Sequence, residues 1–123
     1  MFNKFIEGYT TISKREFLKT KGWISLELQL AIDLLNKEEA AKLAQKVEEY
    51  VDIVEIGTPI VINEGLPAVQ HLNENINNAK VLADLKIMDA ADYEVSQAVK
   101  YGADIVTILG VAEDASIKAA VEE

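Results

Sequence analysis

The sequence predicts a parallel α/β fold built from four strand–helix units. Four short apolar segments typical of buried strands begin at positions 28, 52, 80 and 104, at spacings of 24, 28 and 24 residues. Each is followed by a segment whose apolar residues recur at helical spacing. Short apolar strands joined by helical crossovers indicate a parallel sheet. Four units are half of a (β/α)8 barrel or a nearly complete open sheet of the flavodoxin-like kind, and the pattern alone does not choose between these two.

The first unit combines a strand with a capped helix. Its predicted strand, residues 28–33, reads LQLAID. Asn36 follows where a helix N-cap is expected, and Glu38 and Glu39 then suit the positive end of the helix dipole. The apolar residues at helical spacing are Ala40, Leu43, Ala44, Val47 and Val51.

The other three units follow the same plan. Their strands are predicted at residues 52–57, 80–86 and 104–109. A loop containing Pro59 is expected to lead from the second strand to a helix around residues 66–76. Gly102 is placed to end the third helix, because glycine readily adopts the left-handed conformation that follows a helix. The fourth helix is expected around residues 117–121.

Residues 1–25 differ in charge from the rest of the chain. They hold five Lys or Arg against two Asp or Glu, whereas the whole chain holds 12 against 21 and has a net charge of −9. This change predicts a boundary near Ser25, with residues 26–123 as the folded part. We interpret residues 1–25 as an extension, either a docking segment or a stretch without a role, and hypothesise that it is translated leader ahead of a native start at Leu26.

Composition argues against several classes of protein. The net negative charge argues against a nucleic-acid partner, because phosphate binding needs a basic face. No apolar run approaches the roughly 20 residues of a membrane span, and no secretory signal is visible. The chain has no cysteine, which excludes disulfides and thiolate metal sites and fits a reducing compartment. A cytoplasmic protein without a membrane partner is expected.

Charged residues in the predicted strands indicate a functional site. Asp33 closes the first strand, Glu55 lies in the second, and Asp84 and Lys86 close the third. A carboxylate within an apolar strand is costly unless it meets a cation, a metal ion or hydrogen-bond donors. Residues two apart share a face of a strand, and the C-terminal ends of parallel strands face the ligand site. We therefore expect these four side chains to converge.

Convergent carboxylates suit a hard divalent cation such as Mg²⁺. Glu55 and Asp84 are the candidate ligands, with Lys86 beside them as a fixed positive charge. A metal ion and an ammonium group together can stabilise an oxyanion such as an enediolate. Asp33 and Asp89 are candidates for orienting substrate hydroxyls or moving protons. The alternative is a purely structural ion-pair network among Lys86, Asp84 and Glu55.

Several sequence motifs at the predicted strand ends match those of known proteins. The motif Asp-x-Lys-x-x-Asp, at residues 84–89, is typical of the orotidine monophosphate decarboxylase superfamily. Four longer motifs lie in order at residues 28–34, 51–59, 81–90 and 102–111. Together these four motifs resemble the 3-hexulose-6-phosphate synthase family within that superfamily, and the resemblance covers about residues 26–123.

This resemblance implies the N-terminal half of a (β/α)8 TIM barrel, truncated after the fourth helix, and a homodimer with active sites at the subunit interface. It also implies a Mg²⁺-dependent aldolase that joins formaldehyde to D-ribulose 5-phosphate, giving D-arabino-hex-3-ulose 6-phosphate. By position, Glu55 and Asp84 match the metal ligands, and Lys86 matches the lysine beside the enediolate. Asp33 matches an aspartate that contacts the sugar phosphate. Asp89 matches the aspartate that enters the neighbouring subunit's site.

Two other functions stay open at this point. The sister enzyme 3-keto-L-gulonate 6-phosphate decarboxylase uses the same metal and lysine, so this half of the barrel does not separate the two. A non-catalytic acidic α/β domain, such as a phospho-receiver, would need a second acid after Asp33, where Leu34 and Leu35 stand. Because phosphate typically binds the loops after barrel strands 7 and 8, little or no activity is expected of the 123 residues alone.

Overall fold

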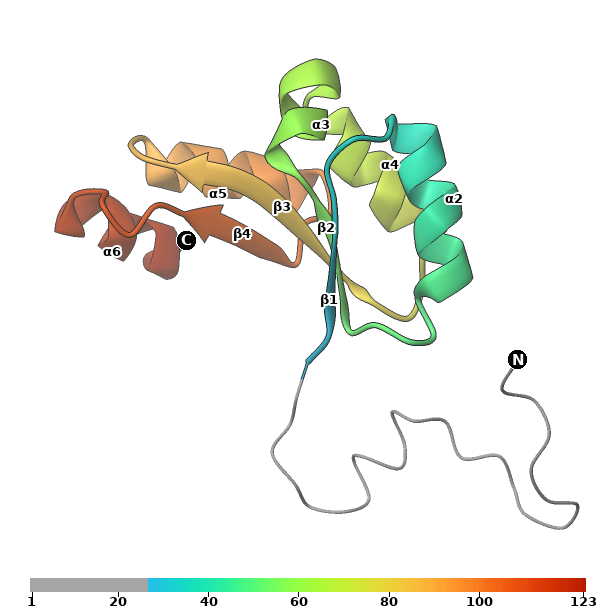
Figure 1. The fold of residues 1–123 in the computed structure, drawn as a ribbon. Coiled ribbons are helices and arrows are strands. Elements are labelled where there is room, and N and C mark those ends of the chain that lie inside the picture. Colours follow the sequence, from blue (N-terminus) through green and yellow to red (C-terminus); the bar gives the residue numbers. More distant parts are fainter. Residues whose placement is uncertain (1–26) are drawn as a thin grey trace, which may run out of the picture.

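The computed structural model describes residues 27–123, so the interpretation of residues 1–25 lies outside the described part. No helix in residues 27–123 is long and apolar enough to cross a membrane. The elements, shown in Figure 1, are β1 (Gln29–Ile32), α2 (Lys37–Val47), β2 (Ile53–Ile56), α3 (Thr58–Glu64), α4 (Pro67–Asn75), β3 (Lys80–Ile87), α5 (Ala91–Lys100), β4 (Ile105–Ile108) and α6 (Asp114–Glu122).

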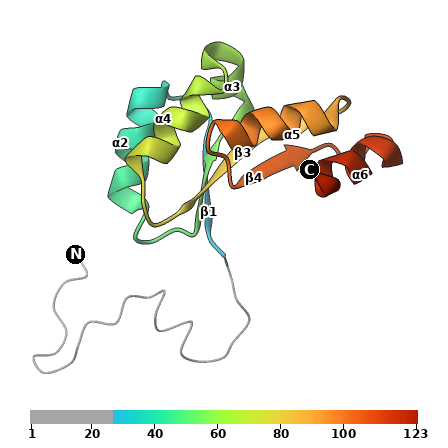
Figure 2. The ribbon, with the colours of Figure 1, turned by 180° about the vertical axis from the view of Figure 1, so that it is seen from behind.

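The strands form one parallel sheet in the order β1-β2-β3-β4. In this sheet β1 and β4 are the edges, and each pairs on one side only. When neighbouring parallel strands that follow one another in the chain are joined by crossover connections of the same handedness, the crossover helices lie on the same face of the sheet. Figure 2, seen from behind, shows α4 and α5 in front of the strands. A flavodoxin-like sheet reverses its strand order and carries helices on both faces. The half-barrel prediction is confirmed, and the open-sheet alternative is wrong.

The core fills the space between the sheet and the helices. Alternate residues of the two central strands face this space and are fully buried, namely Val54, Ile56, Val81 and Ala83. Helices α2, α3, α4 and α5 supply the partners, among them Ala40, Ile60, Leu72 and Ala98. A smaller cluster around Ile87, Ala91 and Val95 continues the core toward α6. The intervening strand residues, such as Glu55 and Asp84, therefore lie on the face that carries no helices.

Local signals set several helix boundaries. The Asn36 side chain accepts the Glu39 N–H at 2.9 Å, and the Glu39 carboxylate accepts the Asn36 N–H, which completes a capping box. Gly102 follows α5 with φ +88°, as expected for the residue that ends a helix. The predicted loop at Pro59 is wrong, because Thr58–Glu64 is helix α3. Proline is tolerated there because the first turn of a helix does not use its N–H groups.

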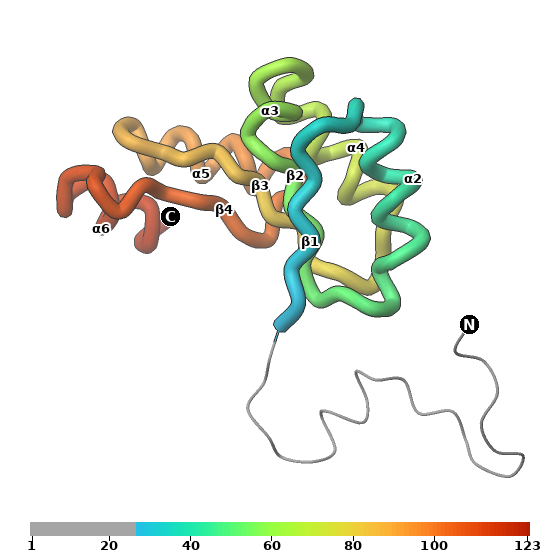
Figure 3. Tube along the Cα trace, in the orientation of Figure 1, coloured from blue at the N-terminus to red at the C-terminus, as the bar shows by residue number. Residues whose placement is uncertain are grey.

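Two aspartates, each the first residue of the repeated motif Asp-Ile-Val, hydrogen-bond to the backbone at the preceding strand. The Asp52 N–H donates to the Leu28 carbonyl at 2.8 Å, and the Asp52 carboxylate accepts the Leu28 N–H at 3.0 Å. In the same way, Asp104 donates to the Val81 carbonyl at 2.8 Å and accepts the Val81 N–H at 2.8 Å. Each aspartate holds its strand in register with the preceding strand. The tube in Figure 3 follows the chain through both strand pairs.

Replacing Asp104 with Ala should destabilise the fold. The substitution leaves the N–H of fully buried Val81 without its carboxylate acceptor, and such a loss costs about 1.5–3 kcal/mol. Urea denaturation followed by circular dichroism measures the change in the free energy of unfolding. Glu49→Ala, at an exposed position, is the control and should change stability by less than about 0.5 kcal/mol. Equal stability of the two variants would contradict the role of Asp104.

Candidate active site

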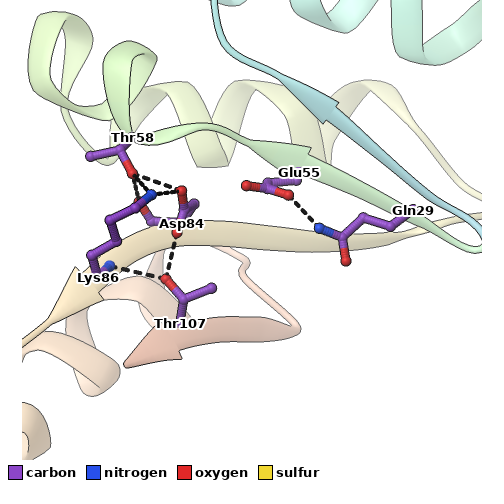
Figure 4. A network of polar contacts seen from close by, with 6 residues as sticks. All are labelled: Gln29, Glu55, Thr58, Asp84, Lys86 and Thr107. Atoms are coloured by element: carbon purple, nitrogen blue, oxygen red, sulfur yellow. Dashed lines mark hydrogen bonds and ion pairs between the residues drawn. The ribbon is translucent and has the colours of Figure 1, made fainter. Parts of the chain in front are cut away.

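Polar side chains gather on the helix-free face of the sheet. Six of them, drawn in Figure 4, are Gln29, Glu55, Thr58, Asp84, Lys86 and Thr107. They come from all four strands and from the first residue of α3. Glu55 and Thr58 flank the C-terminal end of β2, and Asp84 and Lys86 lie in the C-terminal half of β3. This is the end of a parallel sheet at which ligands bind in α/β folds.

Asp84 is the most buried polar residue of this group, at 8% exposed. One carboxylate oxygen, Oδ2, bonds to Lys86 Nζ and accepts from Thr58 Oγ1 at 2.7 Å, while Oδ1 accepts from Thr107 Oγ1 at 2.7 Å. Burial alone would raise the pKa of Asp84, but the hydrogen bonds from Lys86, Thr107 and Thr58 outweigh burial and lower the pKa to about 2. Asp84 is therefore an anion at neutral pH.

Lys86 meets Asp84 through an irregular end of β3. The pairing of β3 with β4 shifts register between Ala83 and Ile87, and Lys86 has φ +51°. That left-handed conformation is uncommon for a residue other than glycine. Lys86 Nζ also donates to Thr58 Oγ1 at 2.6 Å. Asp84 and Lys86 thus lie together as expected, but an irregularity of the strand, rather than its regular alternation, brings them together.

Glu55 projects from β2 toward the Asp84 cluster (Figure 4). Its carboxylate accepts a hydrogen bond from the Gln29 side chain on β1. Burial is the largest cause that raises the pKa of Glu55. The negative charges of Asp84 and Asp33 raise it as well, against the opposing effects of Gln29 and Lys86. The two central carboxylates therefore differ, since Glu55 holds a proton more readily than usual and Asp84 less readily.

The two remaining candidates, Asp33 and Asp89, differ in their position relative to the site. Asp33 lies against Gly57, because a Cβ built on Gly57 would overlap Asp33 Oδ1 and lie 2.7 Å from the Ile32 carbonyl oxygen. The missing side chain at position 57 lets the end of β1 approach the end of β2. Asp89 lies in the exposed segment after β3, and within residues 27–123 no hydrogen bond or ion pair joins it to the site. Asp33 therefore belongs to the group, whereas Asp89 is separate from it.

Sequence reasoning missed three neutral members of the group, Gln29, Thr58 and Thr107. Thr107 interrupts the apolar run of β4, and this is the same kind of signal that singled out Glu55. Gln29, the first residue of β1, likewise interrupts the apolar segment expected at residues 28–33. Thr58 gave no comparable signal, because a threonine before a proline is equally typical of an ordinary helix start.

The residues present can be tested against a Mg²⁺ ion. In residues 27–123 no three carboxylate or histidine side chains form a cluster able to hold a metal ion. The available protein ligands are the carboxylates of Glu55 and Asp84, and Glu55 has a neutral partner rather than a cationic one. Two carboxylates fit Mg²⁺, which usually keeps several water ligands. An ion-pair network with a purely structural role would also contain the Asp84–Lys86 ion pair. A bound Mg²⁺ ion would share the Asp84 carboxylate with Lys86.

Comparison with known proteins identifies clear relatives. A model of the Orotidine 5'-phosphate decarboxylase / HUMPS family matches residues 26–123. A 3-hexulose-6-phosphate synthase of Staphylococcus epidermidis is 99% identical over 98 residues, which cover 80% of this chain and 47% of that protein. A 3-hexulose-6-phosphate synthase of Staphylococcus aureus is 80% identical with the same coverage. The chain spans about half the length of these curated relatives.

Solved structures give the same picture. A crystal structure of 3-hexulose-6-phosphate synthase matches with a TM-score of 0.76 and 48% identity, covering 79% of this chain and 47% of that one. A 3-keto-L-gulonate-6-phosphate decarboxylase from Vibrio cholerae matches with a TM-score of 0.74 and 33% identity, covering 78% and 45%. The four units therefore have the arrangement found in about half of a TIM barrel of this superfamily.

Replacing Asp84 with Asn should destabilise the protein in a pH-dependent way. At pH 7 the loss of charged hydrogen bonds should lower the free energy of unfolding by about 2 kcal/mol. The pKa of Asp84 falls from 3.8 to about 2 on folding. Its stabilising effect is therefore complete above about pH 4 and is lost as the pH falls through 2.

Urea denaturation of both proteins at several pH values measures this effect. The difference between wild type and Asp84→Asn should shrink between pH 4 and pH 2. Glu49→Gln, which removes an exposed carboxylate, serves as the control for net charge. A difference that stays constant down to pH 2 would show that the charge of Asp84 does not stabilise the fold.

Proposed function

Because the chain belongs to the Orotidine 5'-phosphate decarboxylase / HUMPS family, we propose that it is part of a 3-hexulose-6-phosphate synthase. Such an enzyme joins formaldehyde to D-ribulose 5-phosphate and gives D-arabino-hex-3-ulose 6-phosphate, which is the formaldehyde-fixing step of the ribulose monophosphate pathway. The observation that carries this proposal is the 99% identity over 98 residues with the Staphylococcus epidermidis synthase. The charged group at the C-terminal strand ends supports it.

Each charged residue of the group has a role in this proposal. Glu55 and Asp84 would hold Mg²⁺, which when bound supplies Lewis-acid polarisation of substrate oxygens. The ammonium group of Lys86 places positive charge where negative charge develops on the enediolate oxygen. Asp33, beside Gly57 at the rim of the site, orients a substrate hydroxyl group. In the proposed reaction, carbon 1 of D-ribulose 5-phosphate loses a proton to give the enediolate, this carbon bonds to the carbon of formaldehyde as the C=O π bond breaks, and the resulting alkoxide takes up a proton.

Asp89 fits a role outside the site of its own chain. It is exposed, and it follows β3 without a hydrogen bond or ion pair to the site within the described residues. In the proposed homodimer Asp89 enters the site of the neighbouring subunit, which agrees with this separation. We propose no nucleic-acid or membrane partner and a cytoplasmic location.

The sister decarboxylase is the second candidate function. Its solved structures share the fold at TM-scores of 0.74 and 0.72, but their identities of 33% and 30% are below the 48% of the synthase structure. This difference favours the synthase. The phospho-receiver alternative has no support, because receivers have a flavodoxin-like sheet order and this sheet follows the order β1-β2-β3-β4.

A chimera tests the proposed function directly. Residues 26–123 replace the matching 98 residues of the Staphylococcus epidermidis synthase, and the product receives D-ribulose 5-phosphate and formaldehyde. Consumption of formaldehyde should stay within about twofold of the parent enzyme, and no carbon dioxide should form from 3-keto-L-gulonate 6-phosphate. The 123-residue chain alone should reach less than about 1% of the parent rate, because phosphate sites of such barrels typically follow strands 7 and 8. A folded but inactive chimera would refute the proposed function.

Metal binding by the 123-residue chain gives a separate test. Mn²⁺, a paramagnetic substitute for Mg²⁺, can be titrated and followed by electron paramagnetic resonance. Glu55→Gln and Asp84→Asn should each weaken binding at least about tenfold, because each removes one of two charged ligands. The control Glu49→Gln should bind like wild type. Equal Mn²⁺ affinity in all four proteins would contradict the proposed ligands.

A further inference from the structure

The hydroxyl group of Thr107 contacts both members of the Asp84–Lys86 pair. Its Oγ1 atom donates to Asp84 Oδ1 at 2.7 Å and accepts the backbone N–H of Lys86 at 2.9 Å. One hydroxyl can do both at once, because it has one proton to donate and lone pairs to accept. Thr107 lies on β4, so these two bonds join β4 to the irregular end of β3 (Figure 4).

We propose that Thr107 is a positioning residue that fixes the Asp84 carboxylate and the backbone of Lys86 in one geometry. The inference rests on the function proposed above and adds to it a residue without charge. The register shift between Ala83 and Ile87 interrupts the regular pairing of β3 with β4. At this interruption the Lys86 N–H bonds to the Thr107 side chain. The hydroxyl therefore holds Lys86 in the left-handed conformation, with φ +51°, that brings its side chain back toward Asp84.

The contacts of Thr58 differ from those of Thr107, because Thr107 Oγ1 accepts the backbone N–H of Lys86. Thr58 Oγ1 lies 2.6 Å from Lys86 Nζ and 2.7 Å from both Asp84 Oδ2 and the Asp84 backbone carbonyl oxygen, so it contacts both charged tips and the backbone of Asp84. Thr107 contacts the opposite carboxylate oxygen and the backbone of Lys86, and its hydroxyl makes no bond to Nζ. Thr107 thus fixes the Asp84 side chain at its carboxylate and the Lys86 side chain at its backbone, without bonding to the ammonium group. A β-branched side chain suits this role because its χ1 angle is restricted.

Amide hydrogen exchange measured by NMR on the 123-residue chain tests the proposal. Thr107→Ser keeps the hydroxyl, whereas Thr107→Ala and Thr107→Val remove it. The Lys86 amide should exchange at least about tenfold faster in the Ala and Val variants than in wild type, and the Ser variant should resemble wild type. The Leu109 amide, which bonds to the Ile87 carbonyl at 2.9 Å, reports whether the pairing of β3 and β4 persists. If Val disturbs that pairing, the comparison of Ala with Ser decides.

Mn²⁺ affinity separates a role in the site from a role in the fold alone. Loss of the hydroxyl should weaken Mn²⁺ binding by about tenfold, the usual effect of removing a group that orients a metal ligand, and Thr107→Ser should restore binding. Unchanged Lys86 exchange in the Ala and Val variants would overturn the proposal. Faster exchange with unchanged Mn²⁺ affinity would also overturn it, because Thr107 would then serve the fold only. If wild type binds no Mn²⁺, the proposed metal site fails, while the exchange comparison still decides whether Thr107 positions the pair.

Discussion

The pairing of one buried carboxylate governs the arrangement of the site. Asp84 is buried at the point where β3 passes its last pair with β2 and shifts register against β4, and an unpartnered charge there would be costly. Three separate elements supply its partners, namely the start of α3 through Thr58, the end of β3 through Lys86, and β4 through Thr107. The fold and the site are therefore linked at this residue, since the same contacts that make the charge tolerable also place an ammonium group beside it.

Much of the fold is predictable because its signals are local. Strand and helix periods identify the four units, and Asn36 and Gly102 mark helix boundaries by their own chemistry. Pro59 misled the prediction because proline suits both a loop and the first turn of a helix. The choice between half a barrel and an open sheet was beyond the pattern, because strand order depends on contacts between distant segments. The structure supplies that order, and with it the helix-free face.

The charged part of the site is predictable for a different reason. Glu55, Asp84 and Lys86 are conspicuous because charges are rare in apolar strands. Neutral residues such as Gln29 and Thr107 attract less notice, although they hold the two carboxylates. The register shift at the end of β3 gives no periodic signal, so the left-handed conformation that brings Lys86 to Asp84 was not predictable from the alternation of residues. The sequence thus identifies the charged candidate residues more readily than the neutral residues that hydrogen-bond to them and fix their positions.

The one-sided pairing of the outer strands has a consequence for the refolding of this segment in isolation. Edge strands present free N–H and C=O groups, which can template the addition of a strand from another molecule. In the described sheet both β1 and β4 have such an edge. When residues 27–123 are prepared on their own, refolding from denaturant should therefore yield more monomer at low protein concentration.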